Sequence, residues 1–407
     1  MHPDIYMIKR NLLCVCYTAI TIIFSIPTAA QTFSSAKTLT LLHRKENLIV
    51  NSNGKAIWLK GIGFGNNFWS SVPIPVKHHT EADFKRVKDM GMNVIRFYLN
   101  YRTFESDANP FHYKAAGFSW LDKNIAWAKK YNIYLILDMH VPQGGVQSGG
   151  DGIALWKHQN NQKRLEALWQ IAKHYAKEPI IAGYDLVNEP VVTDSIEQWK
   201  HLAQQLVDTI RQVDTNHLLI VERLNAIGKT WKDFNGDNNF FLVNDKNTMY
   251  TFHFYQPFRY IHQLAGWAKM PDGGQYPDDS KVEQGGLPRN KAYLEQQVDQ
   301  YLEFGRRNNV PVYMGEFGRI QHCFKNNKGG IAWVADMLDI LQEKKLHFSY
   351  HVYHEDEFGV YYGDEKAVDT SKANFALINL FKKSWPGLRT RCRPASFENN
   401  EAGMVVL

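Results

Sequence analysis

Two glutamates lie in the sequence contexts that most strongly suggest chemistry. Glu189 belongs to the string Asn-Glu-Pro and Glu316 to Gly-Glu-Phe-Gly, and each follows an apolar run typical of a buried strand. A charged group in such a setting is costly unless it is paired or used. Two facing carboxyl groups suit hydrolysis of a glycosidic bond, because one must donate a proton to the leaving oxygen while the other attacks or activates water. We therefore expect their surroundings to separate their two pKa values.

Polar side chains recur at or near the ends of these and other apolar runs. They are Arg96 in VIRFYL, Asp138 and His140 in LILDMH, Asn188 beside the first glutamate, and His253 and Tyr255 in TFHFY. Any one of them could be a satisfied structural group, but the same feature at so many strand ends favours one shared site. Pro190 adds a local constraint, because it restricts the backbone of the residue before it, and we expect Glu189 to be extended.

The elements that would position these residues alternate between strands and helices. Short apolar runs predict eight strands, at 57–62, 93–99, 133–139, 181–187, 217–221, 249–254, 312–315 and 348–353. Amphipathic runs between them predict helices at 81–90, 119–131, 162–176, 195–213, 291–308 and 331–344. The alternation implies parallel strands, and eight of them allow the sheet to close. We predict an α/β fold with a single (β/α)8 TIM barrel; the alternative is an open doubly wound sheet, although no G-x-G-x-x-G turn follows the first strand.

Other segments predict an accessory hairpin and two long loops. A turn at Asn53 and Gly54, between two apolar runs, predicts an N-terminal β-hairpin across the bottom of the barrel. The connections 141–161 and 256–290 are rich in turn residues, and loops that follow barrel strands stand on the active-site face. Four tryptophans lie at or beyond strand ends, where an indole either stacks on a sugar ring or packs in the core: Trp69, Trp156, Trp231 and Trp267.

Residues 1–30 have the order of a secretory signal peptide. Lys9 and Arg10 precede an apolar run at 12–26, and small residues follow at 28–30. An uncleaved membrane anchor is the alternative, but the run is short for a membrane span. We therefore expect a signal peptide at 1–30 and a catalytic barrel at 31–407, in a protein that is secreted or periplasmic and has no stable membrane association after cleavage.

Cysteine usage and charge limit the partners further. Export would leave Cys323 and Cys392 in a compartment where disulfides persist. A bridge between them stays open, but we expect unpaired thiols, because about nine residues of tail would have to climb roughly 30 Å of barrel. The net charge of +6 is spread over 47 basic and 41 acidic side chains without a long basic run, so we expect no nucleic-acid partner.

Longer strings of this chain resemble the signatures of glycoside hydrolase family 5, the large cellulase family. GYDLVNEP at 183–190 and VYMGEFG at 312–318 are similar to its two catalytic motifs. Further motifs are similar in the expected order: KGIGFGNNFW at 60–69, VIRFYLNY at 94–101, LILDMH at 135–140 and TFHFYQPFRYIHQ at 251–263. The resemblance runs from about residue 45 to 385. It implies a retaining double displacement.

The resemblance also implies a role for each matching residue. Glu189 would be the acid/base and Glu316 the nucleophile. Asn188 would hydrogen-bond the 2-hydroxyl of the sugar being cleaved, Arg96 would hold the nucleophile ionised, and Tyr255 would hydrogen-bond it. His140 and His253 would line the subsite of that sugar. With Trp69, Trp267 and His351, these residues complete our set of candidate substrate-binding residues.

One departure from the family leaves two rival hypotheses open. Where many members place a tryptophan at the end of the eighth strand, this chain has SYHVYHED at 349–356. A metal-dependent hydrolase is one rival, with His140, His253, His351 and Asp356 as ligands, but it leaves the paired glutamates unexplained and no H-x-H pair lies on an early strand. A non-catalytic sugar-binding barrel is the other, although a degenerate enzyme would often have lost one glutamate. We expect no metal and no other cofactor.

We therefore expect a monomeric enzyme that hydrolyses O-glycosyl bonds in a β-linked oligo- or polysaccharide. Endo-β-1,4-glucanase activity is the first hypothesis. β-Mannanase, β-1,3-glucanase and glycolipid glycosidase activities are the alternatives, because the shape of the loops decides the choice of substrate.

Overall fold

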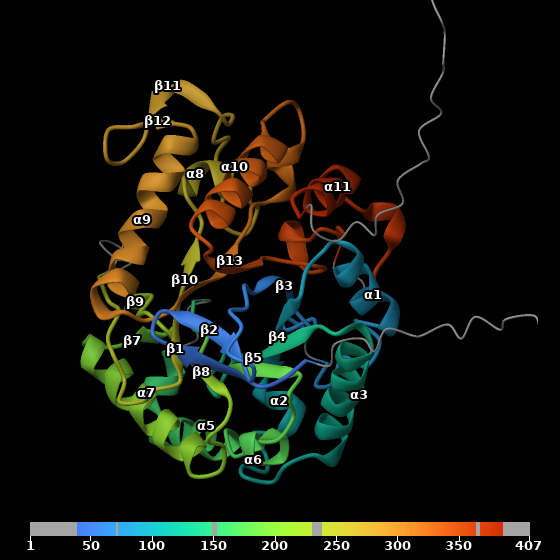
Figure 1. Cartoon of the computed structure of the whole chain (residues 1–407), viewed down its shortest axis with the longest axis vertical. Coiled ribbons are helices and arrows are strands. Elements are labelled where there is room, and N and C mark those ends of the chain that lie inside the picture. The colour runs from blue at the N-terminus through green and yellow to red at the C-terminus, as the bar shows by residue number, and fades with distance from the viewer. Residues whose placement is uncertain (1–38, 71, 149–152, 230–237, 364–366, 386–407) are drawn as a thin grey trace, which may run out of the picture. The chain divides into compact units, whose positions relative to one another are not determined.

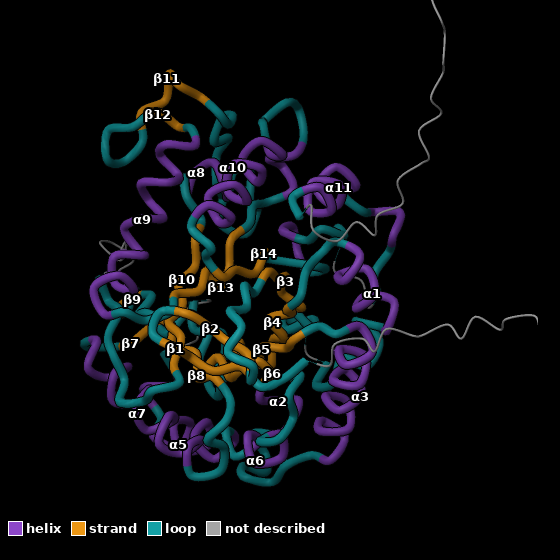
Figure 2. The backbone as a smooth tube through the Cα atoms, viewed as in Figure 1, coloured by secondary structure: helices purple, strands orange, loops and turns teal. Residues whose placement is uncertain are grey.

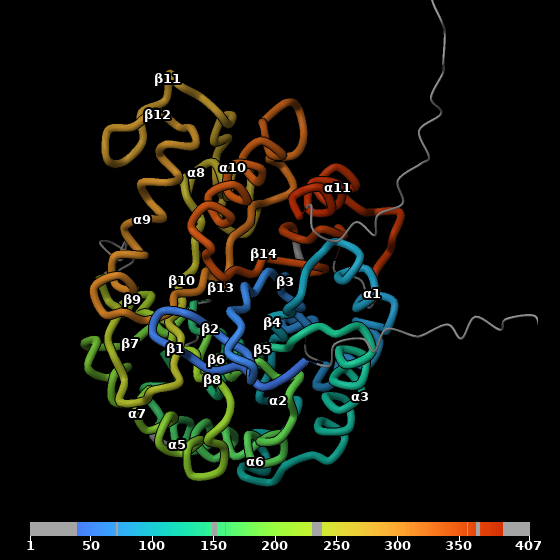
Figure 3. The backbone as a smooth tube through the Cα atoms, viewed as in Figure 1, coloured from blue at the N-terminus to red at the C-terminus, as the bar shows by residue number. Residues whose placement is uncertain are grey.

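Eight parallel strands form a closed barrel at the centre of the molecule. The computed structural model describes residues 39–70, 72–148, 153–229, 238–363 and 367–385, and Figure 3 follows the chain around the barrel from blue to red. In chain order the strands are β3 (Lys60–Phe64), β4 (Val94–Asn100), β5 (Tyr134–Val141), β6 (Ile181–Asp185), β8 (Leu218–Glu222), β10 (Thr248–Phe254), β13 (Val312–Phe317) and β14 (His347–Tyr350). Because β14 pairs with β3, the barrel prediction is confirmed and the open sheet is excluded.

Helices surround the barrel on its outer side (Figure 2). The longer ones are α1 (Glu81–Asp89), α3 (Ala115–Tyr131), α5 (Gln159–Leu168), α7 (Ile196–Arg211), α9 (Lys291–Asn308), α10 (Gly330–Glu343) and α11 (Phe375–Lys383). Short helices are α2 (Tyr101–Phe104), α4 (Ala154–Lys157), α6 (Ile171–Tyr175) and α8 (Phe258–Ile261). The helix predicted at 162–176 is interrupted at Trp169 and Gln170, so that it forms α5 and α6.

The strands alternate between residues that face the barrel interior and residues that pack under the helices. In β4, Ile95 and Phe97 belong to the large apolar layer beneath the helices, whereas Val94 belongs to a second cluster at the bottom of the barrel. Arg96 and Tyr98 follow Val94 at a spacing of two, so they enter the barrel interior above it. The neighbouring Gly63 makes room, because a Cβ atom there would lie 2.6 Å from the Tyr98 hydroxyl oxygen.

An N-terminal hairpin closes the bottom of the barrel, as predicted. It consists of β1 (Leu42–Lys45) and β2 (Leu48–Asn51), which pair antiparallel and cross in front of the barrel in Figure 1. Leu42 and Ile49 from the two strands are buried with the first inward residues of several barrel strands, such as Val94 and Leu218. The hairpin therefore seals the end of the barrel opposite the carboxyl ends of the strands.

The position of the hairpin turn was predicted wrongly. The two strands meet at Glu46, which adopts a left-handed φ of 56°. The predicted turn does form, since the Gly54 N–H donates to the Asn51 carbonyl at 2.8 Å. The segment after it, however, pairs with β2 only through a bridge between Val50 and Ala56, because the chain must enter β3 a few residues later.

Both long loops follow barrel strands and contain secondary structure of their own. The first, 141–161, contains α4. The second, 256–290, contains α8 and a small sheet of β11 (Asp278–Val282) and β12 (Pro288–Arg289), seen beside α9 at the edge of Figure 1. Another small sheet pairs β7 (Val191–Val192) with β9 (Ala226–Ile227). β7 begins shortly after Glu189, and β9 begins shortly after the end of β8.

Several predictions fall outside the described residues. The signal peptide, the domain boundary at residue 30, Trp231 and Cys392 all lie there. Cys323 is described and buried, with its sulfur 3.1 Å from the Tyr260 carbonyl oxygen. Among the helices that the structure describes, none has the length and apolar character needed to cross a bilayer.

Candidate active site

Arg96 is the centre of a buried polar network at the top of the barrel. Its guanidinium is fully buried and donates to Asp185 Oδ2 at 2.9 Å and to Glu316 Oε1 at 2.7 Å. It also donates to Asn188 Oδ1 at 3.0 Å and lies 3.1 Å from Asp138 Oδ1. One positive charge therefore contacts three carboxyl groups. Burial raises the pKa of Asp185 to about 7; the charge of Asp138 adds to that shift, and the charge of Arg96 opposes it.

Glu316 lies at the end of β13, where three hydroxyl or guanidinium donors reach its carboxylate. Arg96 and Tyr98 donate to Oε1 at 2.7 and 3.0 Å, and Tyr255 donates to Oε2 at 2.7 Å. Burial opposes ionisation of this group, but the nearby charges of His253, His351 and Arg96 outweigh burial and hold its pKa well below the ordinary value. Glu316 is therefore an ionised carboxylate that is held in a fixed orientation.

His253 lies between the two glutamates. Its Nδ1 atom is 2.9 Å from Glu189 Oε1 and 3.5 Å from Glu316 Oε2. Carboxylate oxygens of Glu189 and Glu316 and a ring nitrogen of His253 all lie within 4.8 Å of one another. The side chains that end the fourth, sixth and seventh strands of the barrel therefore meet at one point above its centre.

The pKa values of this trio differ from the simple separation that the sequence led us to expect. Burial alone would lower the pKa of His253, but Glu222, Glu316 and Glu189 together raise it to about 9. Burial alone would raise the pKa of Glu189, but the hydrogen bond and charge of His253 lower it. At neutral pH both glutamates are thus ionised, and the proton that they share resides on His253.

The backbone of Glu189 was predicted wrongly. Its φ is 44°, in the left-handed region, rather than extended. The proline rule disfavours the right-handed helical region, but here a hydrogen bond selects another conformation. The Glu189 N–H donates to Glu222 Oε2 at 2.8 Å, and this bond ties the residue to the end of the neighbouring strand β8.

The remaining candidate side chains line the same site. Asn188 accepts from Arg96 through Oδ1, which turns its Nδ2 amide group away from the guanidinium. His140 is held by Asp138, whose Oδ2 is 2.8 Å from Nδ1, and its ring stacks on Tyr98 with 3.9 Å between centroids. His351 Nδ1 lies 3.0 Å from the Tyr98 hydroxyl and 3.6 Å from a carboxylate oxygen of Glu316.

The loop tryptophans divide into two kinds. Trp69 and Trp267 are 60% and 63% exposed, although each contacts an aromatic neighbour, Phe68 at 4.4 Å and His262 at 5.9 Å between ring centroids. Trp156 is only 9% exposed because it belongs to α4, which packs onto the core. Of the described loop tryptophans, two are therefore available to a ligand and one is structural.

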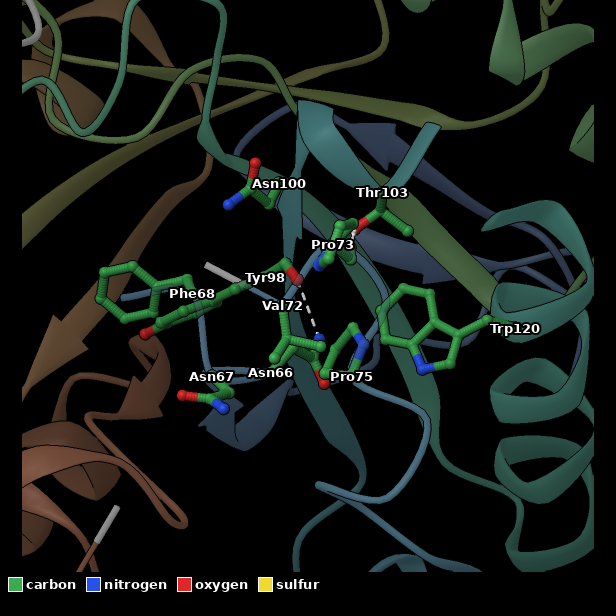
Figure 4. A pocket seen from close by; sticks show the side chains of 10 residues that line it. All are labelled: Asn66, Asn67, Phe68, Val72, Pro73, Pro75, Tyr98, Asn100, Thr103 and Trp120. Carbon is green, nitrogen blue, oxygen red and sulfur yellow. Dashed lines mark hydrogen bonds between the residues drawn. The ribbon is translucent and has the colours of Figure 1, made fainter. Parts of the chain in front are cut away.

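A small pocket lies on the β3 and β4 side of the site (Figure 4). Asn66 and Asn67 line it from the segment after β3, and Tyr98 and Asn100 line it from β4. The Asn66 side chain donates to the Tyr98 carbonyl at 2.8 Å, as the dashed line in Figure 4 shows. The pocket thus places side-chain amides next to a tyrosine that touches Glu316.

Sequence reasoning missed three residues of the site. Tyr98 and Asp185 both contact the central network, and Glu222 contacts both Glu189 and His253. Every second residue of a strand faces the same side of the sheet. Tyr98 could therefore have been identified from Arg96, and Glu222 from the buried Ile220. Asp185 is harder to predict, because β6 ends there and the strand register with β5 shifts.

The alternative ligand set for a metal is only partly assembled. His253 and His351 both lie against Glu316, whereas His140 is paired with Asp138. The neighbours of His351 in the sequence point elsewhere: His354 is buried beneath the loops, and Glu355 contacts His78 at 2.9 Å. Among the residues of SYHVYHED whose side chains the structure describes, His351 lies at the site and others hold the loops; the side chain of Asp356 lies outside the described part of the chain.

Comparisons with known proteins place this geometry in a family. A family model of cellulases (glycosyl hydrolase family 5) matches residues 50–357. Endoglucanase C of Acetivibrio thermocellus is 29% identical over 317 residues, which make up 72% of this chain and 90% of that protein. A β-xylosidase of Phanerodontia chrysosporium is 30% identical over 295 residues, which cover 67% of this chain and 56% of that protein.

Solved structures share the fold. The crystal structure of endoglucanase Cel5A from the hyperthermophilic Thermotoga maritima superposes with a TM-score of 0.62 at 20% identity, covering 80% of this chain and 97% of that one. The match of the family model extends over most of the barrel and includes the segments that carry both glutamates, Arg96 and His253. The chain belongs to glycosyl hydrolase family 5 and is a glycoside hydrolase that acts on O-glycosyl bonds.

Proposed function

We propose that this protein is a retaining β-glycanase and that its preferred substrate is β-1,4-glucan. The observation that carries the mechanism is the close approach of the two glutamates, because one carboxylate oxygen of Glu189 lies within 4.8 Å of one carboxylate oxygen of Glu316. A retaining enzyme needs its carboxyl groups about 5 to 5.5 Å apart, whereas an inverting enzyme needs about 6.5 to 9.5 Å to admit water. Glu316 would be the nucleophile, because Arg96 and two tyrosine hydroxyls keep it ionised and oriented.

The proposed reaction has two displacements. In the first, Glu316 bonds to the anomeric carbon, the glycosidic C–O bond breaks, and Glu189 gives a proton to the leaving oxygen. In the second, Glu189 takes a proton from water, the water oxygen bonds to the anomeric carbon, and the ester to Glu316 breaks. The net reaction is hydrolysis with retention of the β-configuration.

His253 would supply the proton that Glu189 needs. In the free enzyme the Nδ1 atom is 2.9 Å from Glu189 Oε1, so one proton transfer along this hydrogen bond separates the ionised from the acidic form of Glu189. The imidazolium is stabilised in part by the negative charge of Glu316. That charge disappears as Glu316 forms its bond to the sugar, so the first displacement itself would drive the proton from His253 toward Glu189 and the leaving oxygen. The second displacement restores the charge of Glu316, and the proton that Glu189 takes from water then returns to His253.

The choice of β-1,4-glucan rests on the relatives and on the exposed aromatic side chains. Endoglucanase C shares most of its length with this chain, and structures of Thermotoga maritima Cel5A are described in complex with cellobiose and with mannotriose. Trp69 follows β3 and Trp267 follows β10, so two exposed indoles stand on loops from different sides of the barrel. A chain of several sugars suits this arrangement better than a single sugar does.

β-Mannan remains the second candidate, because a specific difference favours a tolerant site. His351 stands where many family members have a tryptophan floor, and an imidazole covers less of a sugar ring than an indole does. We further propose that the protein is exported by its N-terminal segment and acts outside the cytoplasm, on the strength of the charged, apolar and small-residue order of residues 9–30.

The proposal is tested with the purified full chain and two variants. The wild type should release sugar from carboxymethyl cellulose faster than from mannan, xyloglucan or β-1,3-glucan. On an activated aryl β-cellobioside, Glu189→Ala should give a burst of phenolate, because that leaving group needs no proton, and azide should partly restore its turnover. Glu316→Ala should give no burst. A burst from the Glu316 variant instead would reverse the two roles, and no hydrolysis of any β-glycan by the wild type would refute the proposed function.

A further inference from the structure

Glu222 is a buried carboxyl group that the proposed mechanism does not use. It ends β8, directly beside the strand that leads to Glu189, and is 1% exposed. Its Oε2 atom accepts the Glu189 backbone N–H at 2.8 Å, and its Oε1 atom lies 3.5 Å from His253 Nε2. The two oxygens of Glu222 therefore face the two residues that would handle the catalytic proton.

The contact with His253 concerns the ring nitrogen that Glu189 does not use. His253 Nδ1 is directed at Glu189 and Glu316, whereas Nε2 is buried and makes no hydrogen bond to any described residue. Glu222 is the carboxyl group that stands next to Nε2. When Glu222 is ionised, its charge therefore stabilises a proton on Nε2, while a proton on Nδ1 is stabilised from the other side by Glu189 and Glu316.

The backbone contact has a separate consequence. Glu189 adopts a left-handed φ of 44°, a conformation that residues with a side chain adopt rarely and at an energetic cost. The bond from its N–H to Glu222 Oε2 compensates for that cost and directs the Glu189 side chain toward His253. An amide oxygen at position 222 could accept this N–H as well, but it could not supply the negative charge.

We infer that Glu222 is a positioning residue for the acid/base: it fixes the Glu189 backbone through one oxygen and sets the charge of His253 through the other. The inference rests on the proposed function, in which Glu189 and His253 share the proton. In this arrangement the imidazole ring of His253 lies in line between two carboxyl groups, with Nδ1 facing Glu189 and Nε2 facing Glu222.

Other charged groups also face this line. Glu316 approaches His253 Nδ1, and Asp185 and Arg96 act on Glu222 across the barrel interior. Burial raises the pKa of Glu222 to about 8, with Glu189 and Asp185 adding to that shift and His253 opposing it. As the pH rises above about 8, Glu222 becomes an anion that favours a charged His253, which then keeps its proton up to a pH of about 9. Glu222 would thereby extend the working range of the acid toward alkaline pH.

Glu222→Gln tests the charge apart from the backbone bond. An opposite charge within about 4 to 6 Å typically shifts a pKa by roughly one to three units, so the alkaline limb of kcat/KM on cellopentaose should move down by about one pH unit or more. An activated aryl β-cellobioside has a leaving group that needs no proton. With this substrate, the alkaline limb of the pH profile of the burst rate should be the same in Glu222→Gln and in the wild type. Glu222→Ala removes the acceptor as well, so its kcat should fall further than that of Glu222→Gln.

Asp214→Asn is the matched control. Asp214 is another buried carboxyl group beside a buried histidine, with Oδ2 2.6 Å from His217 Nδ1, but this pair lies before β8 at the bottom of the barrel. Its substitution should reduce thermal stability without moving the alkaline limb. If Asp214→Asn shifts the limb as much as Glu222→Gln does, the effect is a general loss of stability and the inference is wrong.

A titration without substrate separates this inference from the proposed function. The imidazole of His253, assigned in NMR spectra as the signal missing from His253→Phe, should titrate at a lower pH in Glu222→Gln than in the wild type. An unchanged titration in a folded Glu222→Gln variant would overturn the inference even if the wild type is an active glycanase. A shifted titration in a protein without glycanase activity would support the charge coupling and refute the proposed function.

Discussion

Replacing Arg96 with lysine should change the pH dependence of the enzyme in a defined direction. Arg96 reaches Asp185, Glu316 and Asn188 through three different nitrogens, whereas an ammonium group carries its three donors on one nitrogen. Lysine therefore cannot serve all of these partners. A hydrogen bond to a charged group is worth about 1.5 to 3 kcal/mol, so loss of the one to Glu316 should lower kcat/KM by about 10- to 150-fold.

The sign of the pH effect follows from the lowered pKa of Glu316. That pKa is held down against burial by His253, His351 and Arg96, so the active, ionised form is present above it and is lost as the pH falls through it. Weakening the Arg96 contact raises the pKa of Glu316. The acid limb of kcat/KM in Arg96→Lys should therefore lie at a higher pH than in the wild type.

Stability sets the conditions of this assay. Breaking a buried ion pair typically costs about 3 to 5 kcal/mol, and a domain is stable by about 5 to 15 kcal/mol, so the variant should fold at 25 °C with a reduced Tm. Arg319→Lys is the control, because Arg319 is equally buried but stacks on Phe324 at 3.9 Å and makes no side-chain hydrogen bond to any described residue. An acid limb that stays in place in folded Arg96→Lys, or that moves equally in Arg319→Lys, would refute the reasoning.

Three further outcomes follow from the site. Tyr98→Phe removes the hydroxyl that donates to Glu316 at 3.0 Å, and kcat/KM should fall about 10-fold in steady-state assays; an unchanged value would show that the bond is dispensable. Trp267→Ala and Trp69→Ala should each raise KM for a long soluble glucan by about 3- to 10-fold but change KM for an aryl glycoside little, whereas Phe375→Ala, a 62% exposed control on α11, should change neither. Incubation with EDTA should leave activity intact; activity that is lost and then restored by a divalent metal would contradict the two-carboxylate mechanism.

The barrel could be predicted from the sequence because its strands are buried on both sides. Each strand is a short apolar run between amphipathic helices, and that contrast is visible without any structure. The hairpin turn was harder to predict from the sequence. Asn53 and Gly54 are a strong local signal for a hairpin, but the segments on either side of them pair through a single bridge. The reason is not local, because the path from Ala56 to β3 limits the pairing.

The site was predictable where a residue type is unusual for its surroundings, as with Arg96 and Glu316. It was less predictable where the residue type is ordinary. Tyr98 reads as one more aromatic core residue unless the strand alternation is followed from Arg96, and the absence of a side chain at Gly63 leaves space for its hydroxyl beside Glu316. The left-handed backbone of Glu189 depends on a partner 33 positions away, so no rule about the neighbouring proline could have foreseen it.

The stereochemistry of the first product tests the two-glutamate mechanism most directly. The wild-type enzyme is mixed with a reduced cello-oligosaccharide, and the anomeric protons of the new reducing end are followed by NMR before mutarotation mixes the two forms. Because one carboxylate oxygen of Glu189 lies within 4.8 Å of one of Glu316, a covalent glycosyl-enzyme and hence the β-anomer as first product are expected. Appearance of the α-anomer first would show that water attacks the sugar directly, and would contradict the assignment of Glu316 as the nucleophile.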